Sequence, residues 1–209
     1  MTPIRLVGFS GSVQRPSRTR TLVEHIGLAV TRRAQVSFRL HDLVDAGPGL
    51  GAAFAREDLS PQAAAVIADI EAADALIVGS PVYKGSYTGL FKHLFDFIEP
   101  AALAGKPVAL TATGGGQKHA LVVEHQLRPL FGFFTALTLP TAVYASDQDF
   151  IDYRLRAPEV IERANAAASQ LAESLLAQAA RAAQSAAPGG NGTERTPDGE
   201  QLYRTPSSG

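Results

Sequence analysis

The sequence predicts a doubly wound α/β fold in three layers, in which helices cover both faces of a five-stranded parallel sheet. Short apolar runs alternate with longer amphipathic segments along the chain. The apolar runs are mostly continuous, which is typical of parallel strands buried on both faces. The chain of 209 residues suffices for one substantial domain and is too short for two of ordinary size.

The first third of the chain opens with a strand, a helix and a strand. Residues 4–10 form a short apolar run that ends in small residues, which predicts a buried strand. Apolar residues at helical spacing predict a helix over 20–33. Alternation of apolar and polar residues predicts a half-covered strand over 35–43, and a Gly-rich loop is expected at 45–54.

The middle of the chain repeats this pattern. A helix is expected over 61–73, with Ser60 as its N-cap and a proline at its first position. An apolar run predicts a strand over 74–80, and amphipathic spacing predicts a helix over 89–100. A further buried strand is expected over 106–116, where it runs into three glycines.

The last third supplies the fifth strand and the final helices. A helix is expected over 119–134, although Pro129 must kink it or break its hydrogen-bond ladder. Residues 137–146 are expected to form one strand, and an Ala-rich segment predicts a long helix from Pro158. Residues 1–184 would then form one domain, and the Gly-, Pro- and Ser-rich residues 185–209 a disordered tail.

Composition excludes several classes of function. The chain has 19 Lys and Arg against 20 Asp and Glu, so it lacks the basic surplus of a general nucleic-acid binder. It has no cysteine, which excludes disulfides, thiolate metal sites and cysteine nucleophiles. The histidines show no metal-ligand spacing, so no metal is expected. We see no signal peptide and no membrane span, and we expect a cytoplasmic protein.

Ligands of open α/β sheets bind at the carboxyl ends of the strands, where the strand order reverses. The loops to consider therefore follow the first, third and fourth strands, at 10–21, 80–88 and 113–118. These loops are the richest in glycine and hydroxyl side chains. The first matches neither the phosphate loop of nucleotide triphosphatases nor the glycine pattern of dinucleotide sites. It offers backbone amides, hydroxyls and arginines before a helix N-terminus, which favours a terminal phosphate; the alternative is a well-capped, solvated loop.

The other two loops suit a flat ring. Pro81 and Gly85 shape a turn that displays Val82, Tyr83 and Lys84, whose backbone amides can bond the edge of a heteroaromatic ring. Three consecutive glycines in the third loop let the backbone approach a ligand closely. An ordinary connecting loop and a flexible linker are the alternatives.

In this order and at these strand ends, the segments GSVQRPSRT, SPVYK and TGGG resemble the NAD(P)H-dependent FMN reductases of flavodoxin-like fold. They are most similar to the reductases that supply alkanesulfonate and methanesulfonate monooxygenases. The resemblance runs from about residue 4 to 177. It implies the sheet order 2-1-3-4-5, FMN as cofactor, NADPH or NADH as co-substrate, and a homodimer or homotetramer that passes reduced flavin to a monooxygenase.

The resemblance also implies roles for particular residues. Gln14 stands beside Arg15 where relatives often have an arginine, which puts the contacts of both with the phosphate in question. Our hypothesis is that Tyr83 and Lys84 are the catalytic positions: they orient the flavin, and Lys84 or the backbone amides of the second loop stabilise the negative charge that develops on it. The predicted FMN ligands are Ser10, Ser12, Arg15, Ser17, Arg18, Thr19, Pro81, Val82, Tyr83, Lys84, Thr113, Gly114 and Gly115.

One further position follows from the resemblance. In the alkanesulfonate type, an inserted residue in the fourth helix makes a π-bulge at a subunit contact, and His125 aligns with it. The alternative is an ordinary helix histidine. Two other functions also stay open: a quinone or azo-dye reductase that retains FMN, and a flavodoxin-like electron carrier. The near-neutral charge argues against the carrier, because acidic surfaces serve electrostatic docking.

Overall fold

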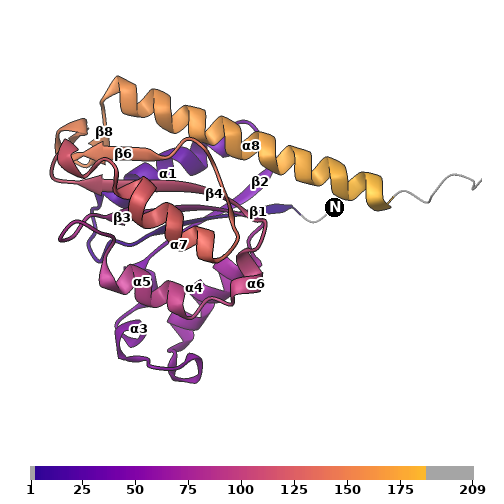
Figure 1. Ribbon diagram of the computed structural model, residues 1–209, viewed down its shortest axis with the longest axis horizontal. Helices are drawn as coiled ribbons and strands as arrows, with labels where there is room; N and C mark the ends of the chain where they lie inside the picture. Colours follow the sequence, from indigo (N-terminus) through magenta and orange to yellow (C-terminus); the bar gives the residue numbers. More distant parts are fainter. Residues whose placement is uncertain (1–2, 187–209) are drawn as a thin grey trace, which may run out of the picture.

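The computed structural model describes residues 3–186, which form three layers around a central sheet (Figure 1). Four strands lie in the order β2-β1-β3-β4, and two short strands, β5 and β6, both pair with β4; all these pairings are parallel. The strands are β1 (Ile4–Ser10), β2 (Val36–Asp42), β3 (Ala75–Pro81), β4 (Pro107–Gly114), β5 (Leu137–Thr138) and β6 (Val143–Ser146). The predicted fold class and strand order are confirmed.

The predicted strand over 137–146 is in fact two strands. Pro140 lies between β5 and β6 and has no N–H to donate to a ladder, so continuous pairing fails there. Leu139 still donates its amide to the carbonyl of Val108 at 2.9 Å. Two short strands, β5 and β6, therefore occupy the fifth position of the sheet one after the other beside β4.

Helices cover both faces. On one face lie α1 (Arg18–Thr31) and α8 (Pro158–Ala186), which runs beyond the sheet (Figure 1). The opposite face carries α4 (Pro61–Ala72), α5 (Gly89–Asp96) and α7 (Arg128–Phe133), with the short helix α6 (Pro100–Leu103). Ser60 caps α4 as predicted, accepting the amide of Ala63 at 3.3 Å. The tail predicted at 185–209 lies outside the described residues, except that 185 and 186 end α8.

The alternation of side chains along the strands separates two hydrophobic cores, one on each face of the sheet. In β3, Ile77 packs toward α1 and α8, whereas Leu76 and Val78 pack toward α4 and α5. Leu6 and Val7 of β1 divide in the same way. Both cores are continuous, because side chains of neighbouring strand residues point to opposite faces.

Two segments differ from the sequence-based expectation. The Gly-rich loop at 45–54 contains the short helices α2 (Leu43–Ala46) and α3 (Gly49–Ala52), followed by the 3-10 turn η1 (Arg56–Asp58). Asp42 caps α2 by accepting the amide of Val44 at 2.9 Å. After β6, the 3-10 turn η4 (Asp147–Asp149) leads into a hairpin of β7 (Phe150–Ile151) and β8 (Arg154–Leu155), which the sequence did not predict.

Candidate functional site

The loops at the carboxyl ends of β1, β3, β4 and β6 surround a cavity of about 260 Å³. The cavity brings together ten of the predicted FMN ligands with residues that we did not predict. Its lining consists of Ser12, Gln14, Pro16, Ser17, Arg18, Thr19, Pro81, Val82, Tyr83, Thr113, Gly114, Gly115, Asp147 and Tyr153.

The loop after β1 is fixed by its own hydroxyls. Ser17 is the N-cap of α1 and accepts the amide of Arg20 at 3.2 Å. The Thr19 and Thr113 hydroxyls lie 2.6 Å apart, so the start of α1 is tied to the end of β4. The positive end of the helix dipole therefore lies at the cavity, as in anion sites.

Two buried polar atoms at this loop lack a partner within the described residues. They are the Oγ of Ser10, which is fully buried at the end of β1, and the Nε of Arg18. Buried polar groups are nearly always hydrogen-bonded, so each unpaired atom calls for a ligand or water. The Arg18 donor lines the cavity beside a helix N-terminus and fits an oxyanion, whereas Ser10, a predicted FMN ligand, does not line the cavity.

Arg18 is held by two residues that lie beyond β6. Its Nη1 lies 3.4 Å from Oδ1 of Asp147, and its guanidinium lies 5.2 Å from the centre of the Tyr153 ring. Both distances permit attraction, one between opposite charges and one between a cation and a π face. The sequence-based reasoning missed both residues, although Asp147 directly follows the fifth strand position and could have been found by that signal.

The structure does not bring Arg15 into the cavity. Its Nε and Nη2 donate to the two carboxylate oxygens of Asp42 at 2.8 and 2.7 Å, and Nη2 also lies 2.6 Å from Asp45. Asp42 and Asp45 raise the pKa of Arg15 above its ordinary value. Arg15 therefore braces the loop against the end of β2, while Gln14 lines the cavity.

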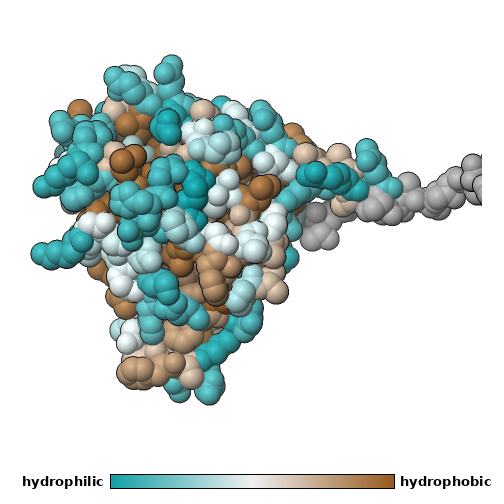
Figure 2. Space-filling view, in the orientation of Figure 1, coloured by the Kyte–Doolittle hydropathy of each residue, from teal (hydrophilic) through white to brown (hydrophobic). Residues whose placement is uncertain are grey.

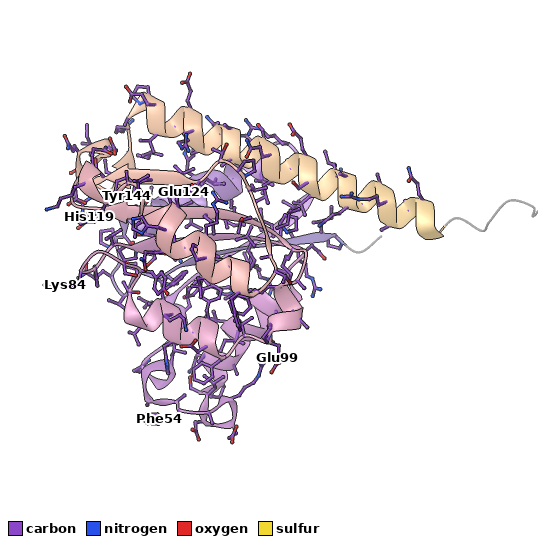
Figure 3. All side chains as sticks on the ribbon, viewed as in Figure 1. Phe54, Lys84, Glu99, His119, Glu124 and Tyr144 are labelled. Carbon is purple, nitrogen blue, oxygen red and sulfur yellow. The ribbon has the colours of Figure 1, made fainter. Side chains whose placement is uncertain are left out.

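The loop after β3 presents its backbone and Tyr83 to the cavity. Val82 donates its amide to the carbonyl of Thr113 at 2.7 Å, and Tyr83 and Ser86 close a tight turn with amide-to-carbonyl distances of 2.9 and 3.2 Å. Lys84 lies at the tip of this turn with φ of 53° and is exposed, outside the cavity lining (Figure 3). Its role toward the flavin stays a prediction, and so does that of Tyr83.

The loop after β4 approaches the cavity closely. A Cβ on Gly114 would lie 2.6 Å from the Tyr144 hydroxyl, so no larger residue fits there without displacement. That hydroxyl donates to the carbonyl of Gly116 at 2.6 Å, and burial raises its pKa. A Cβ on Gly115 would meet nothing within 4 Å, so the backbone there faces open space.

The helix predicted over 119–134 is divided. After the 3-10 turn η2 (Gln117–His119), a π-helical turn, η3 (Val123–Leu127), contains His125 and precedes α7. Arg128 closes it by donating its amide to the carbonyl of Val123. Next to His125, Gln126 accepts the Ser86 hydroxyl at 3.0 Å, so the π turn contacts the loop that bears Tyr83. A role for His125 at a subunit contact stays a prediction.

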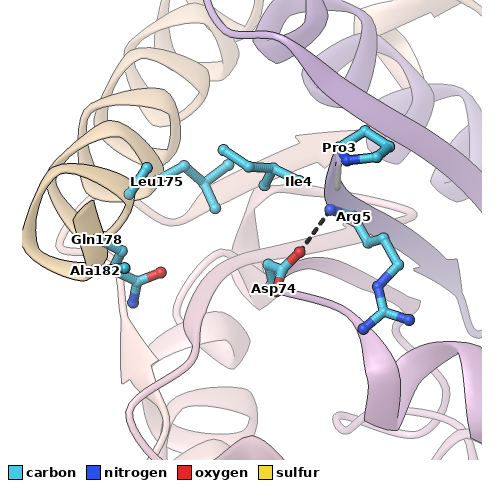
Figure 4. A pocket seen from close by; sticks show the side chains of 8 residues that line it. Pro3, Ile4, Arg5, Asp74, Leu175, Gln178 and Ala182 are labelled. Atoms are coloured by element: carbon cyan, nitrogen blue, oxygen red, sulfur yellow. Dashed lines mark hydrogen bonds between the residues drawn. The ribbon is translucent and has the colours of Figure 1, made fainter. Parts of the chain in front are cut away.

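A second cavity, of about 370 Å³, lies at the opposite edge of the sheet between the amino end of β1 and α8 (Figure 4). Its one carboxylate, Asp74, already accepts the backbone amide of Arg5 at 2.7 Å. Ligands of parallel sheets bind at the other ends of the strands. We therefore place the functional site at the first cavity.

The pattern of strand-end loops agrees with comparisons to known proteins. The model of the NADPH-dependent FMN reductase family matches residues 4–150. The chain belongs to this family. It is 46% identical over 171 residues, 82% of this chain and 92% of the relative, to "FMN reductase (NADPH)" of Pseudomonas aeruginosa. A "NADH-dependent FMN reductase SfnF" of Pseudomonas fluorescens is 46% identical over 81% of this chain and 91% of its own length.

Two solved structures are also similar to this chain. An oxidoreductase from Corynebacterium diphtheriae superposes with a TM-score of 0.74 at 32% identity, over 84% of this chain and 98% of that one. An NADH:FMN oxidoreductase (EMOB) in its apo form gives 0.70 at 30% identity, over 82% of this chain and 89% of that one. The sequence-based prediction of a flavodoxin-like FMN reductase, an oxidoreductase that uses FMN with NADPH or NADH, is confirmed.

The described residues hold no candidate for two other kinds of site. Within residues 3–186, no group of three or more histidines and carboxylates is placed to hold a metal ion. Among the helices of the same residues, none combines the length and the apolar character that a bilayer crossing requires.

Proposed function

We propose that the cavity binds FMN with its phosphate against the loop after β1 and its ring beside the loops after β3 and β4. When bound, FMN supplies the chemistry, because it accepts a hydride from NADPH or NADH. The observation that carries this proposal is the Nε of Arg18, which has no partner within the described residues and belongs to a side chain that lines the cavity at the N-terminus of α1. This donor fits the phosphate oxygens of a mononucleotide.

The residues of the chain then have separate tasks. Ser17, Arg18 and Thr19 bind the phosphate through hydroxyls, the guanidinium and the first amides of α1. Gly115 offers backbone to the edge of the ring, whereas the amide of Val82 is already bonded to Thr113, and the half-exposed Tyr83 shields the mouth of the cavity from water. Such an arrangement orients the flavin and needs no acid or base from the protein.

The test is oxidation of NADPH and NADH by the purified protein, with and without added FMN. We expect oxidation that requires FMN and saturates as its concentration rises, from a protein that purifies largely colourless. A protein that retains FMN and reduces quinones or azo dyes would support the prosthetic-group alternative. FMN binding without any FMN-dependent oxidation of NADPH or NADH would contradict the reductase proposal and favour an electron carrier.

The reduced flavin is proposed to leave the cavity for a monooxygenase that consumes it. The support is the resemblance of the strand-end segments to reductases of sulfonate monooxygenases. Coupled turnover decides the point: a candidate monooxygenase should turn over when this protein, FMN and NADPH or NADH are all supplied. Turnover that stops when the two proteins are separated by a dialysis membrane would indicate direct transfer.

Association of two or more copies is proposed to cover an apolar groove between η1, α5 and α7. The groove has a volume of about 830 Å³ and includes Phe54 and Phe133, which are 95% and 70% exposed. Apolar side chains gather over this lower part of the molecule in Figure 2, and Phe54 lies at its end in Figure 3. Exposed apolar patches of this kind mark interaction surfaces.

Phe133→Glu should therefore lower the molecular mass measured by light scattering after size-exclusion chromatography, because a carboxylate is costly to bury in such a contact. Leu176→Glu is the matched control, since Leu176 is 52% exposed on α8, away from the groove. An unchanged mass for Phe133→Glu would show that copies do not associate through this surface.

A further inference from the structure

The cavity that receives the phosphate has an unusual charge balance. Among its lining side chains within the described residues, Arg18 is the one cation and Asp147 is the one carboxylate. The nearby cations Arg15 and Arg20 are bound to Asp42 and supply no free charge to the cavity. A dianionic phosphate therefore meets one arginine whose charge is already shared with an aspartate.

The contact between Arg18 and Asp147 is loose. Its 3.4 Å exceeds the usual 2.7–2.9 Å of a charged hydrogen bond, and the Asp147 side chain is 53% exposed. Among residues 3–186, the Nε of Arg18 has no acceptor. Asp147 thus keeps the guanidinium near the cavity but does not saturate its donors, and its own charge repels an arriving phosphate.

Tyr153 is held more rigidly. It shares a two-residue hairpin turn with Asp152, with φ of 61° and 46°, the positive values that such turns require. The hairpin is anchored by buried Phe150 and by the amide of Arg156, which donates to the carbonyl of Asp149 at 2.8 Å. The hairpin therefore fixes the backbone of Tyr153, and its ring offers Arg18 a π face 5.2 Å from the guanidinium.

We infer that Asp147 and Tyr153 set, in opposite directions, the strength with which Arg18 holds the phosphate of FMN. Tyr153 fixes the guanidinium for binding. Asp147 weakens binding by repulsion and by competing for the same donors, which favours release of the flavin after reduction. This inference rests on the proposed function, since it takes the phosphate to be that of FMN.

In the experiment, the flavin-free protein is titrated with FMN and with riboflavin, which lacks the phosphate. Binding is monitored by the quenching of flavin fluorescence. Asp147→Asn should lower the Kd of FMN roughly fivefold, because it removes one partly screened repulsion between charges. The difference in Kd between this variant and the wild type should become smaller as salt is added. Tyr153→Leu should raise the Kd of FMN roughly fourfold, and Tyr153→Phe should leave it within about twofold because the π face stays.

Two controls distinguish an effect at the phosphate from a general change in surface charge or folding. Asp152→Asn removes the same charge outside the cavity lining and should leave the Kd of FMN unchanged. The Kd of riboflavin should not respond to any of these variants. Weaker or unchanged FMN binding by Asp147→Asn, or an equal effect on riboflavin, would overturn the inference. If the wild-type protein binds neither flavin, the proposed function itself fails.

Discussion

Replacing Arg18 with alanine is expected to raise the Kd of FMN about 50-fold, which corresponds to about 2.3 kcal/mol for charge-assisted hydrogen bonds. Within the part of the chain that the structure describes, Arg18 is the one cation lining the cavity and its Nε has no acceptor. The loss should appear in the Kd of FMN measured by fluorescence quenching. Riboflavin has no phosphate, so its Kd should change less than about twofold.

The controls for this variant are an arginine just beyond α1 and a conservative change at Arg18 itself. Arg33 follows the opposite end of α1, where it donates to Ser169 and to the carbonyl of Ala29, and Arg33→Ala should leave both flavin affinities unchanged. Arg18→Lys should fall between wild type and Arg18→Ala, because lysine keeps the charge without the planar fork of donors. An equal loss of riboflavin and FMN binding in Arg18→Ala would place Arg18 at the ring and not at the phosphate.

The fold could be predicted because its signals are local. Continuous apolar runs gave β1, β3 and β4, and Ser60 marked the start of α4 before any tertiary contact was known. The hairpin of β7 and β8 was missed because its strands have two residues each, too few for any periodicity. Its turn uses Asp152 and Tyr153 at positive φ, and this pair is not the Asn-Gly or Asp-Gly signal of such turns.

The sequence predicted those site residues that lie in the loops at the carboxyl ends of the strands. Ser17 and Thr19 lie at the start of the helix that follows β1, and Thr113 lies at the carboxyl end of β4, so the topology brings them to the same edge of the sheet. Arg15 was misplaced because sequence shows that a loop carries an arginine but not which partner the arginine meets. Asp42, at the carboxyl end of β2, binds Arg15 through two carboxylate oxygens and so keeps it from the cavity. Asp42 reaches Arg15 because the register of β1 and β2 places it beside Ser10, and the sequence does not show this register.

Asp42→Ala is expected to destabilise the fold strongly, because one carboxylate holds several partners at once. Asp42 is fully buried and accepts from Arg15, from Arg20 at 3.0 Å, and from the amides of Val44 and Asp45. Its removal takes the bidentate partner from Arg15 and the nearer carboxylate from Arg20, leaves both arginines only the half-buried Asp45, and uncaps α2. We expect a loss of about 3 kcal/mol in the free energy of unfolding, measured by urea denaturation.

The matched control is Asp69→Ala. Asp69 also binds an arginine, Arg39 at 2.9 Å, and its carboxylate lies 2.9 Å from the ring of His41; Arg39 is largely exposed, so solvent screens that pair. Its loss should therefore cost about 1 kcal/mol or less. Because Asp42 braces the loop that carries Arg15, its variant should also raise the Kd of FMN, whereas Asp69→Ala should not. Equal losses in the free energy of unfolding for the two variants would contradict this prediction. They would show that Asp42 contributes no more than a surface ion pair and does not brace the loop after β1.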